Sequence, residues 1–156
     1  MVMKIRLNNN LCAIVDQDDL NRLGQYKWKY NGKYAVRSDK NSQNVYMHRE
    51  IMCANSGVQV DHINGDKLDN RKCNLRFANN SQQRMNQGIQ KNNSSGYRGV
   101  TWDKRTKSWK VRVQSYGKVK NLGRFKDKLA AHEAYERVSI EIFGEFKRGF
   151  RILEPA

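Results

Sequence analysis

The sequence predicts an α+β protein made of two small modules. Short strand-like segments bounded by Gly, Asn and Asp recur along the 156 residues. Only one long amphipathic helical repeat is present, from about Asp127 to Phe143. Residues 87–96, QGIQKNNSSG, are polar and glycine-bounded, which is typical of a linker. We therefore expect a first module over residues 1–86, a linker over 87–96 and a second module over 97–150.

The first module is expected to begin with a small β-hairpin region. In residues 26–30, YKWKY, aromatic and cationic side chains alternate, as on a strand with one buried face. Asn31–Gly32 supplies a hairpin turn, and the chain returns through YAVR at 34–37. Residues 47–53 have helical character.

The second module is expected to be a three-stranded antiparallel sheet packed on one helix. Its three strand-like segments are Tyr97–Trp102, Trp109–Val113 and Val119–Leu122. The helix repeats apolar residues at a spacing of four, at Ala130, Ala134, Val138 and Ile142. Packing one sheet face on this apolar stripe is the simplest way to bury both, and it leaves the other sheet face uncovered.

The charge balance points to a polyanionic partner. The formal net charge is +15, the sequence pI is about 10.0 and the mean hydropathy is −0.92. Such an excess favours nucleic acid or an anionic membrane, although some ribosomal and chaperone-like proteins are basic throughout. The chain has no run of 18 apolar residues and no leader pattern, so we expect double-stranded DNA and no membrane.

Many of these cations are expected on the uncovered face of the second module. From Gln87 onward the chain has 16 Lys and Arg against 7 Asp and Glu, which is +9 of the +15. Arg98 and Arg112 are the candidates for contacts with base edges. The complete set of candidate nucleic-acid-binding residues is Arg49, Arg98, Lys104, Arg105, Lys110, Arg112, Lys118 and Lys120.

The cysteines argue against a structural zinc site. Cys12, Cys53 and Cys73 are too widely spaced for paired ligands, and only three histidines are present. An odd number of cysteines without a leader predicts a reducing compartment such as the cytoplasm. A calcium loop is also excluded, because DHINGDKLDN lacks the required ligand phase and a Glu at its twelfth position.

The segment VDHINGDKLDNRKCNLRFANNSQQRMN, residues 60–86, contains the groups that phosphodiester hydrolysis needs. A strand at Val58–Ile63, an Asn-rich loop, a return strand at Leu75–Phe77 and a short helix capped by Asn79 or Asn80 are expected. A neutral imidazole can take a proton from water, and carboxylate and amide oxygens suit magnesium. Asp61 and His62 are neighbours on a strand, so both reach one site only if the strand bends or frays there.

This segment, together with YMHREIM at 46–52, resembles the HNH homing endonucleases of the ββα-metal superfamily that phages and mobile introns carry. The resemblance implies that His62 is the general base, that Asp61 is a metal ligand and that Asn74 orients the His62 ring. It also implies that His48 and Arg49 support the site or contact phosphate; for His48 a structural role is equally compatible.

One position departs from the pattern of that family. The second metal ligand of the family lies on the helix and is usually Asn or His, whereas this chain has Gln83 there. Gln supplies the same amide oxygen on a stem one methylene longer. Asn86, three residues further along the same helix face, is the alternative ligand. The implied metal is magnesium, with manganese as the alternative.

The second module has a resemblance of its own. The segments SGYRGVTWDKRTKSWKVRV and NLGRFKDKLAAHEAYERVSIEIFGEF resemble the plant ethylene-response-factor (APETALA-type) DNA-binding domain, which accompanies such nucleases. The two resemblances together predict a metal-dependent, homing-endonuclease-like enzyme that nicks DNA, as a monomer or a dimer and without a protein partner. The main alternative is a DNA-binding regulator or architectural protein with an inactive nuclease half. An RNA-binding or RNA-cleaving protein is the third reading, and it lacks the expected aromatic strands.

Overall fold

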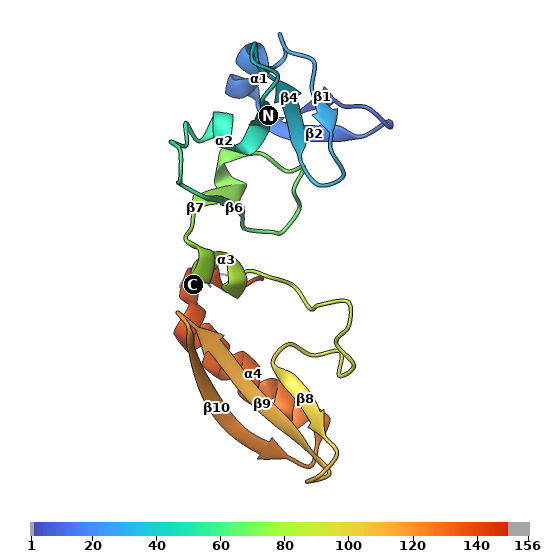
Figure 1. Cartoon of the computed structure of the whole chain (residues 1–156), viewed down its shortest axis with the longest axis vertical. Coiled ribbons are helices and arrows are strands. Elements are labelled where there is room, and N and C mark those ends of the chain that lie inside the picture. Colours follow the sequence, from blue (N-terminus) through green and yellow to red (C-terminus); the bar gives the residue numbers. More distant parts are fainter. Residues whose placement is uncertain (1, 150–156) are drawn as a thin grey trace, which may run out of the picture. The chain divides into compact units, whose positions relative to one another are not determined.

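The computed structural model describes residues 2–149 and confirms the α+β class (Figure 1). The chain forms two compact units, residues 1–79 and 80–156. Each unit has its own hydrophobic core; the described residues of the first form three small antiparallel sheets and those of the second form one. Residue 150, the last of the expected second module, lies outside the described residues. Within 2–149, no helix is long and apolar enough to cross a membrane.

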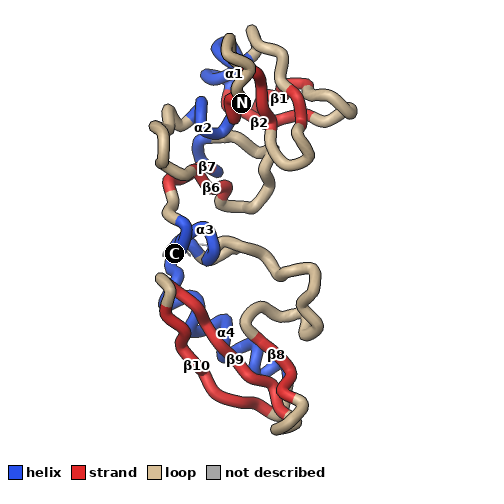
Figure 2. The backbone as a smooth tube through the Cα atoms, viewed as in Figure 1, coloured by secondary structure: helices blue, strands red, loops and turns tan. Residues whose placement is uncertain are grey.

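The first unit contains three small antiparallel sheets and two short helices (Figure 2). Its strands are β1 (Val2–Arg6), β2 (Cys12–Asp16), β3 (Lys29–Tyr30), β4 (Ala35–Ser38), β5 (Asn44–Tyr46), β6 (Val60–His62) and β7 (Leu75–Phe77). Its helices are α1 (Gln17–Leu23), α2 (Met47–Ile51) and the 3-10 turn η1 (Lys72–Asn74). The sheets are β1–β2, β3–β4–β5 and β6–β7, so the expected hairpin, strand pair and helix at 47 are confirmed.

The core of this unit forms where the first sheets and α1 meet. Ala13, Val15 and Leu23 are fully buried, and Trp28 fills the space beside them. The Trp28 indole N–H donates to the Leu23 carbonyl oxygen at 2.8 Å, which satisfies its one donor inside the core. Burial of such side chains supplies about 1.5–3 kcal/mol each and stabilises the platform on which the loop after β6 rests.

That loop, residues 63–74, is attached to β2. Backbone hydrogen bonds of 2.8 Å run from the Ile14 amide to the Leu68 carbonyl and from the Asn70 amide to the Ile14 carbonyl. Within the loop, Arg71 forms two bonds with Asp69, at 2.8 and 2.7 Å, and these bonds lower the pKa of Asp69. The loop therefore holds a defined conformation rather than swinging between its two strands.

The second unit is a three-stranded antiparallel sheet packed on one helix, as expected. Its elements are α3 (Asn80–Met85), β8 (Val100–Asp103), β9 (Ser108–Ser115), β10 (Lys118–Phe125), α4 (Lys128–Phe143) and the 3-10 turn η2 (Gly144–Phe146). The sheet order is β10–β9–β8, and α4 covers one face. The Asp127 carboxylate caps α4 by accepting from the Ala130 amide at 2.7 Å.

Two features tighten this unit. The side chains of Val111, Val113 and Met85 are almost fully buried in one cluster with α4, so α3 belongs to this core. Gly99 has φ +70°, and a Cβ there would lie 2.2 Å from the Tyr135 ring. Only glycine fits, because the backbone of the chain entering β8 passes directly over that ring.

Candidate functional site

His62 lies at the end of β6 and is fully buried. Its carbonyl oxygen accepts from the Gly65 amide at 3.0 Å, so the strand ends in a tight turn at this residue. Its ring lies 5.0 Å from the ring of His48 and 6.2 Å from that of Tyr34, measured between centroids. Strand β6, the β3–β4 hairpin and α2 therefore converge on one imidazole.

The orientation of the Asn70 amide defines the tautomer of His62. The Asn70 Nδ2 donates to the Leu68 carbonyl oxygen at 3.1 Å, so its Oδ1 faces the imidazole and lies 3.2 Å from Nε2. An amide oxygen can only accept, so Nε2 carries the ring proton. The lone pair of the neutral ring then resides on Nδ1, the atom that can accept a proton.

Burial lowers the pKa of His62 below its ordinary value. The hydrogen bond with Asn70 and the carboxylate of Asp61 act in the opposite direction, and the charge of Lys67 adds to the lowering. The ring is consequently neutral at pH 7. A neutral, oriented imidazole is the protonation state that a general base requires.

The Asp61 carboxylate is also buried, with 5 % of the residue exposed. One oxygen lies 3.2 Å from an Arg76 guanidinium nitrogen and the other 3.8 Å from the Lys67 ammonium. Arg76 is the direct cross-strand partner of Asp61 in the β6–β7 register. The chain thus compensates a buried negative charge on this ribbon with two cations, and Lys67 links it electrostatically to His62.

The structure gives Asn74 a different set of contacts from the one that the resemblance implies. Its Oδ1 accepts from the Asn64 amide at 3.0 Å, and its Nδ2 donates to the Asp69 carbonyl oxygen at 2.7 Å. Both ends of this amide therefore brace the loop, while Asn70 is the amide that faces His62. A direct role of Asn74 in orienting the ring stays a prediction. The observed side-chain bonds of Asn74 hold Asn64 and Asp69, which belong to the same loop as Asn70.

His48 forms the second wall around the His62 ring. It is 6 % exposed, and its ring lies 4.9 Å from that of Tyr34 and 5.8 Å from that of Tyr46. Burial, reinforced by the charges of His62, Arg49 and Lys67, lowers the pKa of His48 to about 3. Sequence reasoning did not identify Tyr34, Tyr46 or Asn70; the aromatic alternation in the hairpin was the only available signal for Tyr34.

The buried state of His48 predicts a dependence of stability on pH. Its pKa is lower in the folded protein than the ordinary 6.5, so below pH 6.5 the unfolded chain binds one more proton and stability falls as pH falls. Between pH 6.5 and 5 this residue should contribute a loss of about 2 kcal/mol in the free energy of unfolding. His48→Gln should flatten the slope measured by urea unfolding across that interval; an unchanged slope would contradict this assignment.

The remaining residues of the implied site are on α2 and on α3 and the residue after it. Gln83 is half-buried on α3 and Asn86 is buried directly after it, and both belong to the second unit. Arg49 donates to the carbonyl oxygens of Val58 and, at 2.8 Å, of Asn55, so it supports the loop before β6. Their roles toward a metal or a phosphate are proposals.

A divalent metal fits the donor chemistry of these residues. Within residues 2–149, no group of three or more His, Cys, Asp and Glu side chains is arranged to hold an ion. The implied donors are one carboxylate, Asp61, and one amide oxygen, from Gln83 or Asn86, which are hard ligands of the type that magnesium prefers. Each Asp61 oxygen already faces a cation, so a bound ion would share this carboxylate with Arg76 and Lys67.

The uncovered face of the second unit is basic, as expected. Val111 and Val113 point toward α4, and therefore Lys110 and Arg112 lie on the opposite face of β9. Arg124, which sequence reasoning missed, is the cross-strand partner of Lys110 and lies 3.4 Å from Asp103. Lys104 and Arg105 lie in the turn between β8 and β9 and are exposed.

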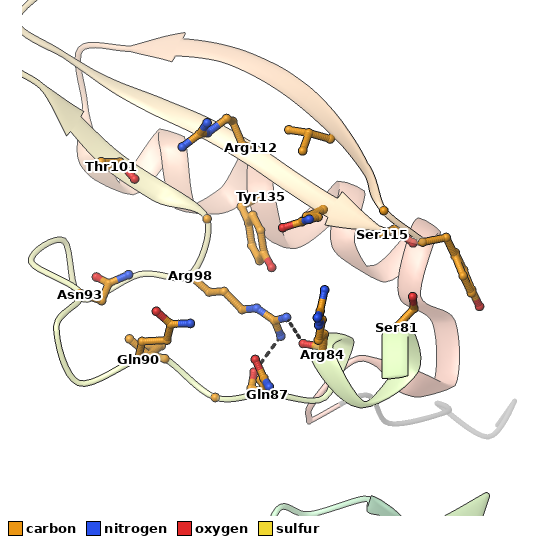
Figure 3. A pocket seen from close by; sticks show the side chains of 17 residues that line it. Ser81, Arg84, Gln87, Gln90, Asn93, Arg98, Thr101, Arg112, Ser115 and Tyr135 are labelled. Atoms are coloured by element: carbon orange, nitrogen blue, oxygen red, sulfur yellow. Dashed lines mark hydrogen bonds between the residues drawn. The ribbon is translucent and has the colours of Figure 1, made fainter. Parts of the chain in front are cut away.

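Three of the predicted nucleic-acid contacts lie away from this face. Lys120 pairs with Val113 and Lys118 with Ser115, so both lie on the side that carries α4. The Arg98 guanidinium donates to three carbonyl oxygens: Met85 at 2.5 Å, Gln87 at 2.7 Å and Arg84. Figure 3 marks the bonds with Gln87 and Arg84. These bonds hold the Arg98 guanidinium at the C-terminal end of α3. A contact of Arg98 with a base, as predicted, would have to replace them.

Comparison with known proteins bears on this site. The sequence profile of HNH endonucleases matches residues 54–85, which include Asp61, His62, Asn74 and Gln83. Protein 3.8 of Escherichia phage T7 is 34% identical over 92 residues, which cover 59% of this chain and 75% of that protein. The uncharacterized HNH endonuclease L560 of Acanthamoeba polyphaga mimivirus is 28% identical over 140 residues, covering 86% of this chain and 72% of the relative. No solved structure is significantly similar to the chain.

The ethylene-response-factor resemblance of the second unit gains no support from these relatives and stays a prediction.

Proposed function

We propose, from the premise that this chain belongs to the same family as protein 3.8 of Escherichia phage T7 and carries an HNH endonuclease domain, that it is a metal-dependent DNA endonuclease with His62 as its general base. The observation that carries this proposal is the state of His62. The ring is buried, neutral at pH 7, and held in one tautomer by Asn70 within the segment that matches the HNH endonucleases.

In this proposal the residues around the His62 ring each have a defined part in proton transfer. Nδ1 of His62 takes the proton from the attacking water, because Nε2 already carries one. The imidazolium that forms is stabilised by the Asn70 Oδ1 on its Nε2 side and by the nearby negative charge of Asp61. His48 and Tyr34 pack beside the ring, and this burial lowers its pKa and keeps it neutral before the reaction.

Asp61 and Gln83 would hold the metal, with Asn86 as the alternative to Gln83 and magnesium as the expected ion. A bound magnesium ion supplies positive charge that stabilises the phosphate and the departing oxygen. Asp61 is the anchor of this assignment, because its carboxylate lies on β6 directly before His62, in the segment that matches the HNH endonucleases. Manganese shares the preference for oxygen ligands.

The basic face of the second unit would bind the DNA backbone. The half-buried Lys110 and the exposed Arg112 on β9, with the exposed Lys104 and Arg105 in the preceding turn, supply the positive charge for this contact. Contacts from such side chains to phosphates supply affinity that falls steeply with salt. One active site per chain is expected to cut one strand, so nicking is the proposed primary product.

The proposal is tested with supercoiled plasmid and magnesium. We expect conversion to the relaxed circular form before any linear product, and no conversion when EDTA replaces magnesium. Parallel reactions with manganese and with varied salt separate metal choice from DNA affinity. Complete absence of cleavage of any DNA with every metal, while DNA binding persists, would instead favour a DNA-binding protein with an inactive nuclease half.

The contact between Asn70 and His62 predicts a positioning role that can be measured. Asn70→Ala removes the acceptor that fixes the tautomer of His62, and we expect the nicking rate at saturating DNA to fall about 10-fold. KM should stay within a factor of two, on the order of the scatter expected for a side chain that does not touch DNA. Asn70→Asp keeps an acceptor oxygen toward Nε2 and should recover part of the rate; equal losses in both variants would contradict the assigned role.

A further inference from the structure

The second unit contains a cavity that the proposed cleavage chemistry does not use. It has a volume of about 580 Å³ and lies between α3, the loop that follows it and the uncovered face of the sheet (Figure 3). Its walls include Arg84 from α3, Arg112 and Gln114 from β9, and Tyr116 from the turn after β9. A cavity of this size suits a ligand of roughly one nucleotide, since small-molecule sites typically measure about 300–1,000 Å³.

The charge of the cavity selects an anionic ligand. None of the described residues that line it is acidic, and three of them are arginines. The guanidinium of Arg98 is engaged by backbone carbonyl oxygens. Arg84 and Arg112 are exposed and form no ion pair with any carboxylate in residues 2–149, so their charges remain available to a phosphate.

Tyr116 gives the cavity an aromatic edge at a conformational cost. It is 58 % exposed and has φ +47°, and the following Gly117 has φ +76°. Two successive positive φ angles define the two-residue turn that favours Asn-Gly, and a bulky aromatic residue is strained in the first position. An exposed ring kept in a strained turn beside two unpaired arginines indicates a binding role rather than a packing role.

We propose that this cavity binds an unpaired nucleotide of the DNA substrate, with Tyr116 stacking on the base and Arg84 and Arg112 contacting its phosphates. The inference rests on the proposed function only in taking DNA as the ligand. Stacking on an aromatic ring together with a cationic groove is how proteins hold single-stranded nucleic acid without requiring one sequence. The side-chain amide of Gln114 lies in the same cavity and can contact the base edge. The protein therefore prefers DNA that contains unpaired nucleotides over fully paired duplex.

The test measures binding in EDTA, where cleavage cannot interfere. Fluorescence anisotropy compares a short labelled duplex with the same duplex carrying a few central mismatches. Wild-type protein should bind the mismatched duplex more tightly, and Tyr116→Asn should weaken that binding about 10-fold while leaving the paired duplex unchanged. Tyr116→Phe, which keeps the ring, should retain the preference. Because Asn suits the turn, Tyr116→Asn should also raise Tm by about 2–4 °C.

A direct readout places 2-aminopurine at the unpaired position. Its fluorescence should be quenched by wild-type protein and by Tyr116→Phe, and not by Tyr116→Asn. Equal affinity of wild-type protein for paired and mismatched duplex would overturn the proposal, as would a loss of both affinities in Tyr116→Asn. Plasmid nicking is scored separately: a preference for mismatched DNA without nicking refutes the enzyme and leaves the cavity assignment standing, whereas nicking without the preference does the reverse.

Discussion

His62→Ala is expected to abolish plasmid nicking while leaving DNA binding intact. Removing a general base costs about 10²–10⁴-fold in rate, which places the variant near the background of the assay. His62 is fully buried on β6 of the first unit, whereas the proposed DNA contacts are exposed cations of the second unit. Affinity measured by anisotropy in EDTA should therefore stay unchanged.

Two further variants separate chemistry from folding in that experiment. His62→Gln retains a polar side chain of similar length in the buried position and has no group that accepts a proton at neutral pH, so it should be as inactive as His62→Ala. His132→Ala removes a histidine that stacks on Tyr97 in the second unit and should keep wild-type nicking. Substantial nicking by a folded His62→Gln protein would exclude His62 as the base.

The fold was predictable where local pattern and packing agree. The helix expected from Asp127 to Phe143 is found at Lys128–Phe143, because its apolar repeat, its Asp127 cap and Gly144 all indicate the same ends. The strands β8, β9 and β10 follow from alternation around tight turns. The local pattern did not predict that α3 packs through Met85 on the core of the second unit. This contact joins the helix to strands that come later in the chain, so the spacing of residues within the helix does not indicate it.

The site shows the same division between local and long-range information. The motif indicates His62 and Asp61, but it does not determine which asparagine of the loop faces the ring. That choice depends on the pairing of Asn70 with Ile14, a residue 56 positions earlier, which sets the path of the whole loop. Tyr34 reaches His48 and His62 from the turn of a hairpin that no spacing rule connects to the motif. Backbone contacts between residues far apart in the chain set where these side chains lie, and no local sequence pattern indicates such contacts.

Arg98→Ala is expected to destabilise the second unit rather than to alter DNA sequence preference. Its guanidinium donates to the carbonyl oxygens of Arg84, Met85 and Gln87, at the end of α3 where helix carbonyls have no partner within the helix. The same charge lies favourably at the negative end of the helix dipole and 5.4 Å from the centre of the Phe143 ring. Losing these contacts should cost about 2–3 kcal/mol, because charge-assisted hydrogen bonds are lost and the partly buried carbonyl group of Met85 loses its Arg98 donor.

That cost is a large share of the roughly 5–15 kcal/mol by which a domain is stable, and it should lower Tm by about 5–12 °C. Arg98→Lys keeps the charge but not the planar fork, so its Tm should lie between those of the wild type and Arg98→Ala. Arg112→Ala is the matched control: it removes an exposed arginine of β9 in the same unit, and it should weaken DNA binding without changing Tm. The two arginines thus have opposite expected signatures, although sequence reasoning assigned both to base edges. If Arg98→Ala instead keeps its Tm and relaxes the sequence preference of binding, then Arg98 contacts a base and the bonds at the end of α3 contribute little to folding.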